Sequence, residues 1–195
     1  MVRILGLSGS LRSGSYNSAL LRAAADVIGS GVIGSEATLE IGSIRGIPLY
    51  DGDVEAADGI PAVVQALKAR VQACDGLLLV TPEYNNGIPG VFKNAIDWLS
   101  RPAAEIPQVF GDRAVALVGA SPGGFGTILS QNAWLPVLRT IGTRPWFGAK
   151  LMVSRANKAF DVDGVLVDDA VRMLLRDYLT GFVRFVAESK RTSTP

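Results

Sequence analysis

The stretch GLSGSLRSGSYN, residues 6–17, joins a short apolar run to an alanine-rich segment. The apolar run, VRILGL at residues 2–7, is typical of a buried strand, and a helical pattern extends over about residues 16–28. A plain connection between a strand and a helix needs only about two to six residues. This one is longer and is dominated by glycine and serine, so it predicts a strand–loop–helix unit whose loop has a function.

The rest of the chain repeats this alternation of strand and helix. Further strands are expected at residues 37–42, 76–81, 113–119 and within 145–153. Further helices are expected at about residues 60–74, 91–100, 127–141 and 166–188, with loop-rich sequence at 43–59. Inside one of these helices Pro136 removes a hydrogen bond and is expected to cause a kink. Because parallel strands are joined by right-handed crossovers, the pattern predicts an α/β fold: a flavodoxin-like three-layer sandwich with a five-stranded parallel sheet in the order 2-1-3-4-5.

Length and charge limit the classes of protein that fit. The 195 residues suit a single domain, expected over residues 1–190 with a flexible tail at 191–195. The 19 basic and 18 acidic residues give a net charge of +1, which argues against nucleic acid or an acidic membrane as partner. No apolar run approaches the roughly 18 residues of a bilayer span. We therefore expect a cytoplasmic protein that acts on small molecules.

The sequence contains no histidine. This absence excludes serine–histidine and cysteine–histidine catalysis, and also zinc or non-haem iron sites that use histidine. The single cysteine, Cys74, excludes an internal disulfide. Any enzymatic chemistry must therefore use carboxylates, backbone dipoles or a cofactor.

The loop in residues 8–17 has the composition of an anion site. Its glycines allow backbone N–H groups to converge, and Arg12 offers a fork of donors for phosphate oxygens. Hydroxyl donors come from Ser8, Ser10, Ser13 and Ser15. The alternative is a flexible surface loop in which a serine caps the following helix.

The spacing of the glycines narrows the type of phosphate. The triphosphate pattern GxxxxGK[ST] is absent, and the dinucleotide pattern GxGxxG fails because the glycines stand at 6, 9 and 14. A monophosphate held by hydroxyls, amides and one arginine fits better, and flavin mononucleotide (FMN) is the candidate.

Two further loops follow predicted strands at the same edge of the sheet. TPEYNNGIPG, residues 81–90, offers an aromatic face at Tyr84 and an amide at Asn85, as a planar ring requires. ASPGGFG, residues 120–126, has adjacent glycines whose N–H groups can approach the edge of a flavin. Each loop taken alone is equally consistent with an ordinary turn, but three such loops at one edge favour a ligand site.

Three segments, GSLRSGSYN, PEYNNGIPGVFKNAIDWLSR and SPGG, together resemble the NADPH-dependent FMN reductases, which include chromate, quinone and azo-dye reductases. The resemblance implies three groups of FMN-binding residues. The phosphate would be held by Ser10, Arg12, Ser15 and Asn17. The ribityl chain and ring would be lined by Pro82, Glu83, Tyr84 and Asn85. The isoalloxazine edge would meet Ser121, Gly123 and Gly124.

The expected function is transfer of hydride from NADPH or NADH to bound FMN, and of electrons onward to a quinone, free flavin, azo or metal-oxyanion acceptor. No catalytic side chain and no metal site are expected, because the flavin carries the redox chemistry. The resemblance also implies a homodimer or homotetramer. Arg101 could bind a phosphate of the nicotinamide cofactor, or could serve as a helix-end cation or interface ion pair. The alternatives are a flavodoxin-type electron carrier, which is usually strongly acidic, and a non-catalytic binding module.

Overall fold

A computed structural model describes residues 1–31, 33 and 37–192. Its six strands pair in parallel, in the order β2-β1-β3-β4-β5, and β6 pairs with β4 beyond β5. The strands are β1 (Val2–Ser8), β2 (Ala37–Gly42), β3 (Gly76–Val80), β4 (Ala114–Ala120), β5 (Arg144–Pro145) and β6 (Leu151–Val153). The predicted α/β class and strand order are therefore confirmed.

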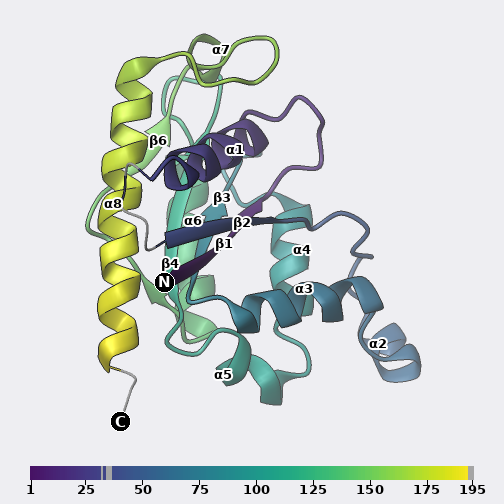
Figure 1. The fold of residues 1–195 in the computed structure, drawn as a ribbon. Helices are drawn as coiled ribbons and strands as arrows, with labels where there is room; N and C mark the ends of the chain where they lie inside the picture. The colour runs from purple at the N-terminus through teal and green to yellow at the C-terminus, as the bar shows by residue number, and fades with distance from the viewer. Residues whose placement is uncertain (32, 34–36, 193–195) are drawn as a thin grey trace.

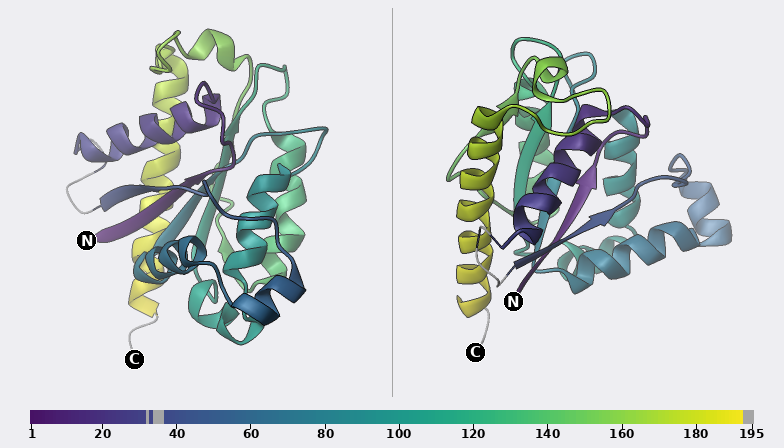
Figure 2. Two further views of the ribbon diagram at one scale, coloured as in Figure 1. Left: turned by 90° about the vertical axis from the view of Figure 1, so that its right-hand side faces the viewer. Right: turned by 45° about the horizontal axis from the view of Figure 1, so that its top comes forward.

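Helices cover both faces of this sheet, as Figures 1 and 2 show. One face is covered by α1 (Tyr16–Gly29) and α8 (Asp169–Thr192). The other is covered by α3 (Ala62–Ala73), α4 (Gly90–Leu99) and α6 (Ile128–Thr140). Short helical segments complete the chain: α2 (Gly52–Asp58), η1 (Ala103–Glu105), α5 (Ile106–Val109) and α7 (Ala156–Ala159). None of the helices within the described ranges is long and apolar enough to cross a membrane.

The central strand β3 shows why the sequence runs as unbroken apolar residues. Successive side chains of a strand point to opposite faces, and helices cover both faces here. Leu78 therefore joins the core beneath α1 and α8, while Leu77 and Leu79 join the core beneath α3 and α4. All three are at most 1% exposed, and burial of each stabilises the fold by about 1.5–3 kcal/mol.

The outermost position of the sheet differs from the prediction of one strand within 145–153. β5 and β6 each pair with β4, and the chain between them leaves the sheet. At the point of departure lies Trp146, whose indole packs edge-on against Tyr178 of α8, with ring centroids 4.7 Å apart. A Cβ atom at Gly148 or Gly181 would lie 2.6 or 2.7 Å from this indole, so both glycines make room for it.

One short helix and the start of the last helix also differ from the prediction. The segment expected to be loop contains α2, which has no buried residue and therefore no apolar periodicity; Asp51 caps it by accepting from the Asp53 N–H. The last helix begins at Asp169 rather than at 166, because Asp168 Oδ1 accepts from the N–H groups of its first turn. Residues 191 and 192 of the predicted tail belong to α8, and residues 193–195 lie outside the described residues.

Candidate functional site

The three loops singled out in the sequence follow β1, β3 and β4. These strands are parallel neighbours, so all three loops leave the same end of the sheet (Figure 2). The hydrogen-bond ladder continues past the strand ends, because Gly9 N–H donates to Val80 O at 2.9 Å and Thr81 N–H donates to Val118 O at 2.8 Å. The bases of the loops are thereby fixed relative to one another.

The loop after β1 ends in a serine cap on α1. Ser15 Oγ accepts from the N–H groups of Asn17 and Ser18, at 3.2 and 3.3 Å. A hydroxyl has two acceptor positions and one proton, so Ser15 retains its proton for donation to another group. Ser10 Oγ accepts from Arg12 N–H at 3.4 Å and likewise retains its proton. Both hydroxyls therefore suit an anion held at the start of α1.

The same loop carries further hydrogen-bond donors that have few or no partners. The N–H groups of Leu11, Ser13 and Gly14 donate to no group in the described part of the chain. The exposed guanidinium of Arg12 contacts only Gly14 O, at 3.4 Å, and forms no ion pair within that same part. Free N–H groups, a helix N-terminus and an unpaired cation in one loop together fit a phosphate group.

Asn17 makes a different kind of contact. Its side-chain Nδ2 donates to Ala120 O at 2.8 Å, and its Oδ1 accepts from Ala120 N–H at 2.9 Å. The side chain is 4% exposed, so both amide groups are used in fastening the start of α1 to the end of β4. The structure therefore shows Asn17 orienting two of the loops, and a phosphate contact by this residue stays a prediction.

In the loop after β3, Glu83 caps another helix. Its Oε2 accepts from the N–H groups of Leu129 and Ser130 at 2.8 and 3.1 Å. The N-cap residue of α6, Thr127, makes no side-chain cap of its own, so the carboxylate satisfies that helix end and complements its dipole. The contacts of Glu83 are those of a helix cap and do not support a general-base role.

The tip of this loop is a tight turn that presents Tyr84. Tyr84 and Gly87 exchange backbone hydrogen bonds of 3.2 and 3.0 Å, and the two residues between them have φ values of 50° and 62°. Both are asparagines, Asn85 and Asn86, which tolerate the left-handed conformation that this mirror-image turn requires. Tyr84 is 47% exposed, whereas Pro82 before it is buried, so an aromatic face is available beside a rigid base.

The loop after β4 is held to the segment that follows β6. Ser121 N–H donates to Val153 O at 2.9 Å, and Ser121 Oγ accepts from Gly123 N–H at 3.2 Å. Gly123 O in turn accepts from Arg155 N–H at 3.0 Å. The Gly124 N–H donates to no group of residues 1–31, 33 and 37–192, so it is available to an acceptor on a ligand.

Thr81 belongs to the site and was not singled out from the sequence. It is buried, and its Oγ1 lies 3.0 Å from Pro82 O, 2.9 Å from Ser130 Oγ and 3.0 Å from the indole Nε1 of Trp134. The hydroxyl thus connects the start of the β3 loop to α6. The signal for it was a polar residue directly after a fully buried strand.

Arg101 forms an ion pair within the chain. Its Nε donates to Glu55 Oε2 at 2.8 Å, and Glu55 also accepts from the Tyr50 hydroxyl at 2.9 Å. The hydrogen bond from Arg101 lowers the pKa of Glu55. Arg101 therefore joins the end of α4 to α2, and its role in binding the nicotinamide cofactor, at the helix end or at an interface stays a prediction.

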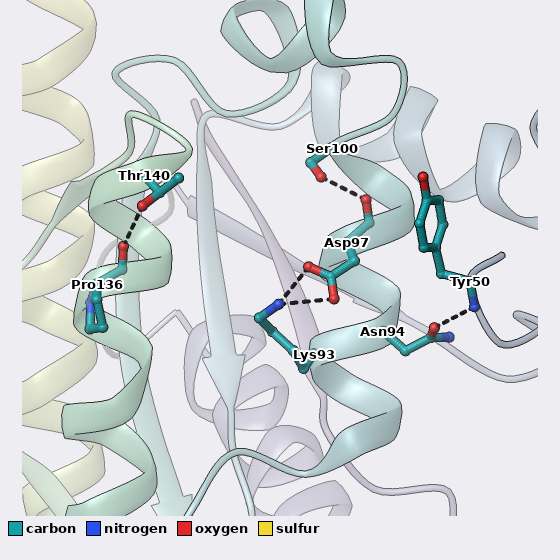
Figure 3. A network of polar contacts seen from close by, with 7 residues as sticks. All are labelled: Tyr50, Lys93, Asn94, Asp97, Ser100, Pro136 and Thr140. Carbon is teal, nitrogen blue, oxygen red and sulfur yellow. Dashed lines mark hydrogen bonds and ion pairs between the residues drawn. The ribbon is translucent and has the colours of Figure 1, made fainter. Parts of the chain in front are cut away.

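The backbone before α2 is held to α4, as Figure 3 shows: Tyr50 N–H donates to Asn94 Oδ1 at 2.9 Å. On the same helix Lys93 and Asp97 form an ion pair of 2.7 Å.

Figure 3 also shows α6 running through Pro136, where Thr140 Oγ1 donates to Pro136 O at 2.9 Å. The proline therefore does not end this helix.

The parallel sheet in the order β2-β1-β3-β4-β5, with helices on both faces, defines a flavodoxin-like fold. A family model described as NADPH-dependent FMN reductase matches residues 2–158. This chain belongs to that family. It is an oxidoreductase that uses NAD(P)H, with FMN as its cofactor.

Individual relatives agree with this assignment. The chain is 43% identical over 178 residues to an NAD(P)H-dependent FMN reductase of Pseudomonas aeruginosa, covering 91% of each protein. It is 38% identical to an NAD(P)H:quinone oxidoreductase of Solanum tuberosum, covering 92% of this chain and 90% of the relative. Among solved structures, the flavoenzyme NAD(P)H:(acceptor) oxidoreductase FerB of Paracoccus denitrificans superposes with a TM-score of 0.83 at 28% identity, covering 97% of this chain and 99% of FerB.

Proposed function

We propose that this chain is a quinone reductase of the FMN reductase family, which also passes electrons to free flavins, azo compounds or metal oxyanions. Relatives named as quinone reductases support the acceptor class, including one of Escherichia coli that is 33% identical and covers 97% of both chains. The observation that carries the proposal is the set of hydrogen-bond donors around Arg12 that have no partner in the described chain. They lie at the same end of the sheet as the exposed ring of Tyr84.

In this proposal the three loops divide the binding of FMN. Ser10, Arg12 and Ser15 hold the phosphate by donating to its oxygens, and Asn17 keeps their loop in place through Ala120. Pro82, Glu83, Tyr84 and Asn85 form the wall along the ribityl chain and ring. Ser121, Gly123 and Gly124 face the edge of the isoalloxazine.

When bound, FMN accepts hydride from the nicotinamide and delivers electrons to the acceptor. The protein contributes position and electrostatics. The exposed face of Tyr84 provides flat contact, and the Gly124 N–H is a preorganised donor for negative charge on the ring. Glu83 keeps the α6 N-terminus capped, so no side chain is assigned an acid or base role.

We further propose that residues 1–190 act as one domain that assembles as a homodimer or homotetramer in the cytoplasm, with no nucleic-acid or membrane partner. Exposed apolar side chains beside the loops support an assembly surface: Phe125 is 85% exposed, and Ile128 and Leu129 are 41% and 44% exposed. The net charge of +1 supports the absence of nucleic acid and membrane partners.

The purified protein tests this function directly. We expect a yellow protein, or a colourless one that gains a flavin spectrum on incubation with FMN. NADPH or NADH without oxygen should bleach the flavin, and a quinone should restore the colour. Failure to bind FMN would overturn the proposal. Binding without oxidation of either dinucleotide would favour the electron carrier.

The variant Arg12→Ala tests the phosphate assignment. Loss of a charge-assisted hydrogen bond of about 1.5–3 kcal/mol should weaken FMN binding by roughly tenfold to a hundredfold. Arg139→Ala is the matched control, because Arg139 lies in the last turn of α6, at the opposite end of that helix from the loops. If FMN binds both variants equally well, the assignment of Arg12 is wrong.

A further inference from the structure

A pocket of 350 Å³ lies at the outer edge of the sheet, where the chain leaves β5 and returns as β6. Pairing with β4 stops at Trp146, whose N–H donates to Val115 O at 2.8 Å, and resumes at Leu151. Leu117 of β4 lies at this gap, and the pocket is lined from both faces of the sheet, by α6 on one and by Tyr178 of α8 on the other. Its volume falls within the range of about 300–1,000 Å³ that small-molecule sites occupy.

The walls of the pocket are mainly apolar, and contacts within the protein hold them in place. Trp146, Phe147 and Met152 line it from the connection between β5 and β6 and from β6 itself. The indole of Trp146 packs edge-on against Tyr178, and the Tyr178 hydroxyl donates to Leu117 O at 2.8 Å. A ligand therefore does not have to order these walls when it binds.

The polar side chains of the pocket favour an anionic group. Lys150 is exposed and forms no ion pair or side-chain hydrogen bond within residues 1–31, 33 and 37–192. The side-chain amide of Asn132 also has no partner in that part of the chain, whereas Gln131 Nε2 donates to Thr127 Oγ1 and Leu151 O. Neither aspartate nor glutamate is among the described residues that line the pocket. A cation and an amide thus lie beside an apolar interior.

The pocket is separate from the flavin loops. Among the described residues that line it, none belongs to the loops after β1, β3 and β4. The loop after β4 passes behind one wall, since a Cβ atom at Gly126 would lie 2.8 Å from Met152 Cβ. Binding in the pocket therefore leaves every residue assigned to FMN free for the flavin.

We propose that this pocket binds a small aromatic carboxylate. The ring packs among Trp146, Phe147 and Met152 through edge-to-face and sulfur–aromatic contacts. The carboxylate accepts hydrogen bonds from Lys150 and Asn132, and the charge-assisted bond to lysine selects an acid over its neutral amide. An aliphatic acid lacks the ring contacts, and a neutral arene lacks the ionic one.

Isothermal titration with 2-naphthoate tests the pocket in the FMN-loaded protein, without turnover. The acid should bind at least roughly tenfold more tightly than neutral 2-naphthamide, as one charge-assisted contact implies. Lys150→Gln should remove this preference, and the fold should tolerate it because the side chain is unpaired. Lys158→Gln is the matched control and should preserve the preference, because Lys158 is exposed on α7 and does not line the pocket. Equal binding of acid and amide to the original protein, or equal losses in the two variants, would overturn the inference.

Labelling with fluorotryptophan locates the ligand in the original protein. Of the three tryptophans, Trp146 lines the pocket, whereas Trp98 and Trp134 are fully buried elsewhere. Adding 2-naphthoate should shift one fluorine resonance, the one that Trp146→Phe removes, and leave the other two in place. Saturating NADP⁺ or a quinone should change the affinity for 2-naphthoate less than about twofold. Displacement by either would assign the ligand to the flavin site and contradict the proposal, as would a shift of all three resonances.

Discussion

Gly9 and Gly14 lie in the same loop but tolerate a side chain differently. A Cβ atom at Gly9 would lie 2.3 Å from Phe92 Cδ1 and 2.9 Å from Pro82 Cδ, whereas one at Gly14 would meet no atom within 4 Å. Because Phe92 is fully buried, the contact at Gly9 cannot be relieved by a small rotation. Gly9→Ala should therefore lower the free energy of unfolding by about 1–3 kcal/mol.

Urea unfolding measures this difference, and Gly14→Ala is the matched control. Its free energy of unfolding should stay within about 0.5 kcal/mol of the original or rise slightly, because alanine restricts the unfolded chain. Equal losses in the two variants would show that the loop, rather than the contact with Phe92, sets the cost.

Glu83 offers a second prediction at the scale of one residue. Glu83→Gln removes the charge that caps α6, so the free energy of unfolding should fall by about 0.5–2 kcal/mol. Turnover at saturating substrate should change less than about threefold, because the carboxylate faces the N–H groups of Leu129 and Ser130. Glu40→Gln, in a pair exposed to solvent, is the control and should cost less than about 1 kcal/mol. A large loss of turnover with unchanged stability would instead indicate a general-base role for Glu83.

At the scale of elements, α2 depends on one ion pair. It has no buried residue, and Glu55 contacts both Arg101 and Tyr50. Since the hydrogen bond from Arg101 lowers the pKa of Glu55, the pair stabilises α2 above the ordinary carboxyl pKa. That contribution is lost as the pH falls through the lowered pKa of the folded state.

Hydrogen exchange of residues 52–58 measures this loss. Protection, corrected for intrinsic exchange rates, should be high at neutral pH and fall in acid. In Glu55→Gln it should already be low at neutral pH and depend little on pH. If the variant keeps the original protection at neutral pH, the ion pair does not hold α2.

The elements that the sequence predicted well are those whose signal is local. β3 and β4 read as unbroken apolar runs because both of their faces are covered, and α1 shows its cap at Ser15 and its apolar spacing. The split between β5 and β6 was missed because Trp146, where the chain leaves the sheet, packs against Gly181 in a helix far along the chain, and no local pattern signals that contact. α2 was missed because it has no apolar face to produce a periodic signal.

The candidate site was predictable as a place more than as a set of contacts. Alternating parallel strands put the loops after β1, β3 and β4 at one end of the sheet, and that position is confirmed. The partners of Asn17 and Glu83 were not predictable, because Ala120 and Leu129 lie 103 and 46 residues away along the chain. Local composition identifies the hydrogen-bond donors, but the packing of distant segments determines which of these donors already have a partner within the protein.

At the scale of the whole molecule, FMN should stabilise the fold through its phosphate. A ligand that binds only the folded state at a hundred times its Kd adds about 2.7 kcal/mol, which for a chain of this size raises Tm by roughly 5–11 °C. Riboflavin has the same ring but lacks the phosphate, so at equal concentration it should raise Tm much less. Differential scanning calorimetry of the flavin-free protein measures both shifts. Arg12→Ala should reduce the shift with FMN and leave the shift with riboflavin unchanged. Equal shifts with FMN and riboflavin in the original protein would mean that the loops after β3 and β4 hold the flavin without help from the loop after β1.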